Sequence, residues 1–205
     1  MFVCLAVAGK DFVVCCTDTR ISSGYSILKR THKKVTKLTD TCMITSGGMV
    51  ADIDALHKNL LTRIRIYKMQ NKREPTPESI AKLLSNTLYG RRFMPFYAFN
   101  LLCGLDATTG EGVIYGYDAI GSYQTVNYGC QGSGSELGIS VLDNQFTGHN
   151  HLVKKLPTDQ DDVCATLKDC INAIAERDIY TGDHCHTMVL DKNGYREMMD
   201  DVRRD

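Results

Sequence analysis

Two apolar runs flank a short polar turn in Leu5-Ala6-Val7-Ala8-Gly9-Lys10-Asp11-Phe12-Val13-Val14-Cys15-Cys16-Thr17-Asp18. Apolar runs of this length on either side of Gly9-Lys10-Asp11 predict a buried β-hairpin with a tight turn. Because a hairpin brings its two ends together, Asp18 is expected to lie beside the first residues of the chain.

A second charged residue and a pair of glycines complete the pattern around this hairpin. Asp18 closes the second apolar run, Lys34 follows in His32-Lys33-Lys34-Val35-Thr36-Lys37, and Gly47-Gly48 comes after Met43-Ile44-Thr45. Asp18 and Lys34 suit a buried ion pair between two strands, and losing one partner of such a pair costs about 3–5 kcal/mol. The glycines suit a tight turn from a strand into a helix, because glycine tolerates any φ.

With this arrangement the chain resembles a β-type subunit of the proteasome core particle, a member of the N-terminal-nucleophile hydrolase superfamily. The resemblance covers nearly the whole chain. In active members the first mature residue is a threonine whose free α-amine acts as the base, while an Asp and a Lys on neighbouring strands tune its hydroxyl. By spacing, the resemblance assigns these two roles to Asp18 and Lys34, the oxyanion-hole glycine to Gly48, and the nucleophile's place to Phe2.

Phe2 cannot perform the chemistry of that position. The reaction needs a hydroxyl or thiol on the residue that carries the free amine, whose pKa of about 7.7–8.0 suits a general base. A phenyl ring has no lone pair for attack, and Met1 precedes it, so the free amine belongs to another residue. The resemblance therefore implies a non-catalytic member with a vestigial site.

Longer motifs indicate which type of subunit within the family the chain resembles. The stretch Leu88-Tyr89-Gly90-Arg91-Arg92-Phe93-Met94-Pro95-Phe96-Tyr97 leads into Asn100-Leu101-Leu102-Cys103-Gly104-Leu105-Asp106, and Leu142-Asp143-Asn144-Gln145 follows Gly132-Ser133-Gly134-Ser135. Together they resemble the non-catalytic sixth β-type subunit of eukaryotic particles.

One more element belongs to the vestigial site that the resemblance implies. Ala175-Glu176-Arg177-Asp178-Ile179-Tyr180-Thr181-Gly182-Asp183 matches the family's Arg-Asp-x-x-Ser/Thr-Gly element, which puts an Asp and a hydroxyl beside the nucleophile in catalytic relatives. The implied vestigial positions are Phe2, Asp18, Lys34, Gly48, Ser133, Asp178 and Thr181.

Composition predicts a single globular domain over residues 1–205. The chain has 205 residues, of which 43% are hydrophobic and 23% are charged, which suffices for a sizeable core. Its formal net charge is +0, and no block of like charges exceeds Lys33-Lys34 or Arg203-Arg204. We therefore expect neither nucleic acid nor a membrane as partner.

The nine cysteines indicate a reducing compartment. They are odd in number, scattered from Cys4 to Cys185, and form no Cys-x-x-Cys pair, so we expect buried free thiols rather than a disulfide scaffold. The first apolar run lacks a preceding basic region and is interrupted at Lys10-Asp11, which argues against a secretory signal or a spanning helix. The expected location is the cytoplasm and nucleus.

The periodicity of apolar residues alternates between strand and helix patterns. Strands are predicted at 5–18 (as the hairpin), 24–28, 34–38, 41–46, 97–104, 112–117, 122–128, 186–190 and 195–199. Helices are predicted at 49–71, 76–90, 135–144 and 158–178, with Thr76 and Thr158 as N-caps and Gly132-Ser133-Gly134-Ser135 capping the third. The strands at 97–128 are expected to form a meander. This order fits the α+β, four-layer αββα sandwich that the resemblance implies.

Three other features could suggest a ligand site, but each is explained more simply by a structural role. Gly132-Ser133-Gly134-Ser135 lacks the lysine of a phosphate-binding loop. In His184-Cys185-His186 alternate residues of a strand face opposite sides, so two histidines at most share a metal. Arg91-Arg92 is too short for an RNA-binding stripe. We expect no cofactor, nucleotide or metal.

Two functional hypotheses follow. In the first, the chain is a structural subunit of the four-ring, 28-subunit barrel: it contacts other α and β subunits in its own and the opposite ring, lends surfaces to their substrate pockets in ubiquitin-dependent degradation, and hydrolyses nothing. In the second, processing exposes Cys4 as the nucleophile of an active amidohydrolase. Against this, Cys4 lies two residues inside the register that Asp18 and Lys34 set. An α-type subunit would carry a helix before the first strand.

Overall fold

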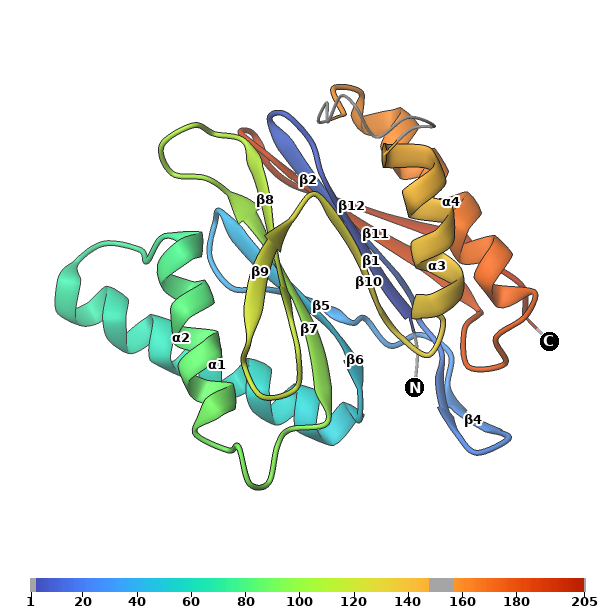
Figure 1. The fold of residues 1–205 in the computed structure, drawn as a ribbon, viewed down its shortest axis with the longest axis horizontal. Coiled ribbons are helices and arrows are strands. Elements are labelled where there is room, and N and C mark those ends of the chain that lie inside the picture. Colours follow the sequence, from blue (N-terminus) through green and yellow to red (C-terminus); the bar gives the residue numbers. More distant parts are fainter. Residues whose placement is uncertain (1–2, 148–156, 205) are drawn as a thin grey trace.

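The structure, a computed structural model, describes residues 3–147 and 157–204 and contains two five-stranded antiparallel sheets (Figure 1). The first sheet has the order β10-β1-β2-β11-β12. Its strands are β1 (Val3–Ala8), β2 (Phe12–Asp18), β10 (Tyr128–Gly132), β11 (His184–Asp191) and β12 (Gly194–Asp201). The predicted hairpin is confirmed, with Ala8 opposite Val13 and every residue of β1 and β2 buried.

The second sheet has the order β5-β6-β7-β8-β9. Its strands are β5 (Val35–Lys37), β6 (Cys42–Gly48), β7 (Ala98–Leu105), β8 (Gly112–Tyr117) and β9 (Tyr123–Val126). In the sequence between β2 and β5, β3 (Ile21–Ser23) and β4 (Ser26–Lys29) form a separate two-stranded hairpin, which projects from the rest of the molecule (Figure 1).

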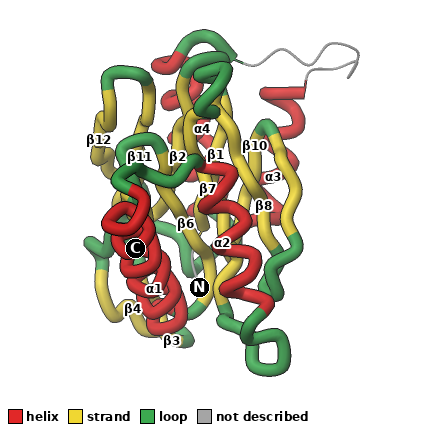
Figure 2. The backbone as a smooth tube through the Cα atoms, turned by 90° about the vertical axis from the view of Figure 1, so that its left-hand side faces the viewer, coloured by secondary structure: helices red, strands yellow, loops and turns green. Residues whose placement is uncertain are grey.

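Helices cover the outer face of each sheet and complete the expected four-layer αββα sandwich. They are α1 (Val50–Asn71), α2 (Pro77–Tyr89), α3 (Ser135–Leu142) and α4 (Gln160–Ala175), and a short π-helical turn, η1 (Asp143–Thr147), follows α3. Figure 2 looks onto α1 and α2 with the sheets behind them. Among the described residues, no helix has the length and apolar character needed to cross a membrane.

Three apolar cores hold the layers together. One lies between α1, α2 and the second sheet and is centred on Leu56, Leu60 and Leu84. Another lies between α3, α4 and the first sheet, and the third lies between the two sheets around Met43 and Leu101. Each such leucine contributes about 1.5–3 kcal/mol by leaving water. The sheets are therefore buried on both faces, which explains the nearly continuous apolar runs of β1 and β2.

The predicted meander is confirmed, since β7, β8 and β9 pair in that order; the strand β10 that follows was not predicted, and it pairs with β1 of the first sheet. Three local expectations need correction. The N-cap of α4 is Asp159, whose side chain accepts from the N–H groups of Asp161 and Asp162, and not Thr158. The stretch predicted to cap α3 does contain its N-cap, Gly134, but no side chain makes the expected cap hydrogen bond. The strand β3 precedes the predicted segment 24–28, in which Gly24 is a turn residue with φ 57°.

A buried polar chain joins α1 to the second sheet. The Asn100 amide donates to the Ala98 carbonyl, so its Oδ1 accepts from the Ser46 hydroxyl at 2.6 Å. Because the only Ser46 proton is then used, His57 Nε2 donates to Ser46 Oγ at 2.8 Å, and His57 Nδ1 lies 2.9 Å from the Thr36 hydroxyl. Burial lowers the pKa of this imidazole to about 4, so it is neutral at pH 7 and its Nδ1 accepts from Thr36.

This neutral imidazole predicts a local loss of stability in acid. When α1 opens, His57 regains a pKa near 6.5 and takes up a proton that the closed form binds only near pH 4, so stability is full above about pH 6.5 and falls toward pH 4. Between pH 7 and pH 5 the free energy of opening α1 should drop by about 2 kcal/mol. Hydrogen exchange, corrected for its intrinsic pH dependence, measures this; helix α4, which contains no histidine, is the control, and an equal change in both helices would contradict the assignment.

Candidate functional site

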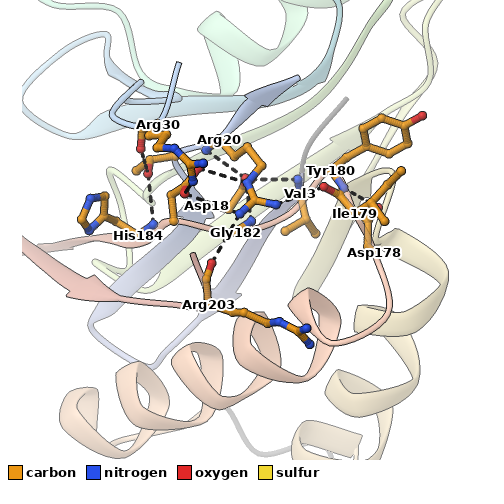
Figure 3. Close-up of polar contacts among 12 residues, drawn as sticks. Val3, Asp18, Arg20, Arg30, Asp178, Ile179, Tyr180, Gly182, His184 and Arg203 are labelled. Atoms are coloured by element: carbon orange, nitrogen blue, oxygen red, sulfur yellow. Dashed lines mark hydrogen bonds and ion pairs between the residues drawn. The ribbon is translucent and has the colours of Figure 1, made fainter. Parts of the chain in front are cut away.

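The carboxylate of Asp18 is fully buried at the end of β2 and accepts four hydrogen bonds from the described residues; Figure 3 shows those from Val3, Arg20 and Gly182. Its Oδ1 accepts from Lys34 Nζ at 2.6 Å and from the Val3 N–H at 3.1 Å. Its Oδ2 accepts from the N–H of Arg20 at 3.1 Å and from that of Gly182 at 3.4 Å. Asp18 therefore joins the start of β1, the end of β2, the segment before β5 and the loop before β11.

Lys34 is as deeply buried as its partner, and its ammonium group also donates to the Arg20 carbonyl at 2.8 Å. Burial lowers the pKa of Lys34 to about 8 and raises the pKa of Asp18, because each charged form loses hydration, while their mutual attraction opposes both shifts. The described partners of Asp18 are all donors and those of Lys34 are acceptors. This geometry fits a carboxylate and an ammonium, as the sequence predicted.

A second buried ion pair, which the sequence analysis missed, lies beside the first. Arg20 Nε donates to Asp183 Oδ2 at 3.0 Å, and Arg20 Nη1 donates to the Ile179 carbonyl at 3.2 Å. Arg30 also pairs with Asp183, which adopts the left-handed conformation at φ 73°. The signal in the sequence was the charged residue Arg20 two positions after a buried strand; its partner lies 163 positions away.

The predicted group of Ser133, Asp178 and Thr181 is present as a hydrogen-bonded cluster. The hydroxyls of Ser133 and Thr181 each donate to Asp178 Oδ2 at 2.7 Å, and the Tyr180 N–H donates to Asp178 Oδ1 at 3.1 Å. The residues that follow Asp178 connect this cluster to the ion pairs through the Gly182 N–H and the Ile179 carbonyl. Ser133, expected in a helix cap, serves Asp178 instead.

The two glycines after the apolar part of β6 are required by close backbone contacts. Gly48 has φ 142°, and a Cβ there would lie 2.1 Å from the Tyr97 carbonyl oxygen. A Cβ on Gly47 would lie 2.8 Å from the Gly132 Cα, so the sheets approach closely next to Ser133. The contacts rule out larger side chains at both positions.

Six of the seven positions that the resemblance implies for a vestigial site can be located. Asp18 and Lys34 form one centre, Ser133, Asp178 and Thr181 form a second that hydrogen bonds connect to it, and Gly48 lies in the strand next to Gly47. The seventh, Phe2, lies outside the described residues. In the sequence it directly precedes Val3, whose N–H binds Asp18.

The structure argues against Cys4 as a nucleophile. Cys4 lies inside β1, where it is paired with Thr17 of β2 and with Gln131 of β10, and its side chain is fully buried. Burial raises the pKa of its thiol to about 12, which leaves almost no thiolate at neutral pH. A chain start at Cys4 would remove Val3, which pairs with Gly132 of β10 and whose N–H donates to Asp18.

The cysteine thiols are mostly buried, and His184 and His186 each pair with a carboxylate. All nine cysteines are free thiols and eight are buried, as expected; Cys164 is half-buried. His184 pairs with Asp201 at 3.0 Å and His186 with Glu197 at 2.6 Å. Within residues 3–147 and 157–204, no three His, Cys, Asp or Glu side chains are grouped so that they could hold a metal ion.

Comparisons with known proteins place this geometry among relatives. The family model described as "Proteasome subunit" matches residues 3–190. The chain is 43% identical over 207 residues to the proteasome subunit beta type-1 of Oryza sativa subsp. japonica, covering 98% of this chain and 93% of the relative. It is 44% identical over 193 residues to that of Dictyostelium discoideum, covering 93% and 81%. Against the proteasome subunit beta type-6 of Saccharomyces cerevisiae it is 32% identical over 211 residues, covering 98% and 87%.

The buried ion pair predicts that replacing Lys34 costs far more stability than replacing the adjacent Lys33. Lys34→Ala leaves Asp18 as an unpaired buried charge and should lower the free energy of unfolding by about 3–5 kcal/mol. Lys33→Ala removes a half-exposed lysine that pairs with Glu197 at the surface, which should cost about 0–1 kcal/mol. The urea concentration at which added protease digests half of the chain measures both; equal effects would contradict the buried-pair interpretation.

Proposed function

The chain belongs to the family of proteasome β-type subunits, and on this premise we propose that it is a non-catalytic, structural subunit of the core particle. It forms part of the β ring and supports the threonine-protease sites of neighbouring subunits in ubiquitin-dependent protein degradation. Family membership implies assembly with other proteasome subunits; the four-ring, 28-subunit barrel and a location in cytoplasm and nucleus are part of the proposal.

One observation supports the proposal most strongly: Phe2, the residue at the position of the nucleophile in the resemblance, cannot attack a peptide bond. Phe2 precedes Val3, whose N–H is bound to Asp18, and Phe2 has neither hydroxyl nor thiol. The charged groups that would tune a nucleophile in a catalytic relative are instead satisfied by each other and by backbone groups. This arrangement favours a structural role for them.

Exposed apolar side chains support assembly into a larger particle. Tyr25 on the projecting hairpin is 98% exposed, and Phe93 and Met94 in the loop after α2 are 95% and 83% exposed. Large apolar side chains in such positions are typical of surfaces that bind other proteins. We expect neighbouring subunits to cover them.

We assign the chain to the sixth β position on its motifs at 88–106 and 132–145. The yeast relative is named beta type-6, in line with this assignment, while the plant and Dictyostelium relatives are named beta type-1. Native mass spectrometry of the purified particle, with subunit order read from cross-links, tests it.

The non-catalytic role predicts selective chemistry in the intact particle. An epoxyketone directed at N-terminal threonines should modify neighbouring β subunits and leave this chain unmodified, because Phe2 offers no hydroxyl. Mass spectrometry of each subunit after saturation of the particle's peptidase activity provides the measurement. The labelled neighbours are the internal control. An adduct on this chain, at Cys4 or elsewhere near its N-terminus, would overturn the proposal.

The structural role also predicts how the chain behaves alone. Expressed without partners, it should aggregate or remain incompletely assembled, because the apolar side chains at Tyr25, Phe93 and Met94 stay in water. Light scattering after co-expression with other subunits and after solitary expression provides the comparison. A monodisperse 22.9 kDa monomer that stays soluble for days would count against the proposal.

A further inference from the structure

Two buried cysteines on neighbouring strands place their sulfur atoms close together. Cys16 of β2 and Cys185 of β11 are fully buried, and their Sγ atoms lie 2.8 Å apart. A disulfide bond measures about 2.05 Å, so a small shift of the two side chains brings the sulfurs to bonding distance. Neither thiol contributes to the Asp18 and Lys34 centre, and the proposed function makes no use of them.

The sheet itself sets this proximity. In the pairing of β2 with β11, Cys16 lies opposite Thr187 and Cys185 lies opposite Asp18, so the two cysteines are diagonal neighbours on one face. That face is covered by α3 and α4, and both cysteines belong to the core between these helices and the first sheet (Figure 1). Because the pairing continues along both strands, the two sulfurs are held together by the fold.

The surroundings of the two sulfurs give them different roles. The Thr187 hydroxyl lies 3.4 Å from Cys16 Sγ and 3.6 Å from Cys185 Sγ. The contact with Cys16 lowers the pKa of Cys185 despite its burial, whereas the same contact, together with burial, raises the pKa of Cys16. Since the thiolate is the reactive form of cysteine, Cys185 is the attacking sulfur and Cys16 is the one that keeps its proton.

A second pair of buried thiols provides an internal comparison. Cys15 of β2 and Cys103 of β7 lie in different sheets, with their Sγ atoms 3.3 Å apart. Burial raises the pKa of Cys103 well above its usual value, so this thiol holds its proton at neutral pH. Shorter separation and thiolate character therefore both favour reaction at Cys16 and Cys185 over reaction at Cys15 and Cys103.

We propose that Cys16 and Cys185 are a redox modification site at which hydrogen peroxide closes a reversible disulfide between β2 and β11. The Cys185 thiol first loses its proton, and its sulfur attacks a peroxide oxygen. The O–O bond breaks, and the departing hydroxide takes up that proton to become water. The Cys16 sulfur then attacks the sulfur of the Cys185 sulfenic acid; the S–O bond breaks, and the hydroxide leaves with the Cys16 proton as a second water. The two thiols lose two electrons, which the peroxide gains, and a thiol reductant reverses the bond by exchange.

The bond would cross-link distant parts of the chain. Cys16 and Cys185 are 169 positions apart in the sequence, and the whole second sheet lies between them. A cross-link across so long a loop restricts the unfolded chain and so stabilises the folded one. The oxidised chain should therefore resist unfolding more than the reduced chain.

Mass spectrometry of the wild-type chain tests the bond directly. The chain in its native assembly is treated with hydrogen peroxide, denatured in a thiol-blocking reagent and digested with trypsin without reductant. The Cys16–Cys185 linkage should exceed the Cys15–Cys103 linkage roughly tenfold and disappear with dithiothreitol. Because Cys15 and Cys16 share the peptide 11–20, fragmentation between them locates the bond. Recovery of Cys16 and Cys185 as free thiols, or a prevailing bond between another pair, would overturn the inference.

Resistance to unfolding tests the consequence, with a matched control variant. Peroxide should raise the urea concentration at which added protease digests half of the wild-type chain, and dithiothreitol should reverse this shift. Cys185→Ser should abolish the shift, whereas Cys103→Ser should retain it. No shift in the wild-type chain, or an equal shift in Cys185→Ser, would contradict the proposal. If Cys185→Ser fails to fold, the mass-spectrometric test, which needs no variant, still decides.

Discussion

The carboxylate of Asp18 holds several chain segments together at the start of β1. Its donors come from parts of the chain that lie far apart in sequence: Val3, Lys34 and Gly182. Lys34 directly precedes the second sheet, whereas Asp18 closes the second strand of the first sheet, so their contact ties the two sheets together. Removing this charge would leave several buried donors without a partner, each costing about 1–3 kcal/mol.

The pairing of Asp18 with Lys34 also gives each of the two charges a structural role. A buried carboxylate and a buried ammonium stabilise each other, and neither can be lost alone without leaving an uncompensated charge. Arg20 reinforces the arrangement, since its backbone binds Asp18 and Lys34 while its side chain pairs with Asp183. Together these contacts join the start of β1, the end of β2, the segment before β5 and the loop before β11.

Local patterns predicted much of the fold, and long-range pairing accounts for what they missed. The hairpin at 5–18 and the start of α2 at Thr76-Pro77 depend on neighbouring residues, so the sequence revealed them. The crossing of β10 depends on its pairing with β1, 127 positions from Cys4 to Gln131, and no local signal reports it. In the site, spacing predicted which residues come together around Asp18 and Asp178, but the Arg20 and Asp183 pair required the folded geometry.

A double-mutant cycle on Asp18 and Lys34 tests the central claim most directly. Asp18→Asn, Lys34→Met and the double variant are compared by the urea midpoint for protease digestion of the chain in purified particles. If the pair is a mutual structural constraint, each single change destabilises strongly and the double change costs at least about 2 kcal/mol less than the sum of the two. Costs that add within about 0.5 kcal/mol would show that the two groups act independently and would contradict the account.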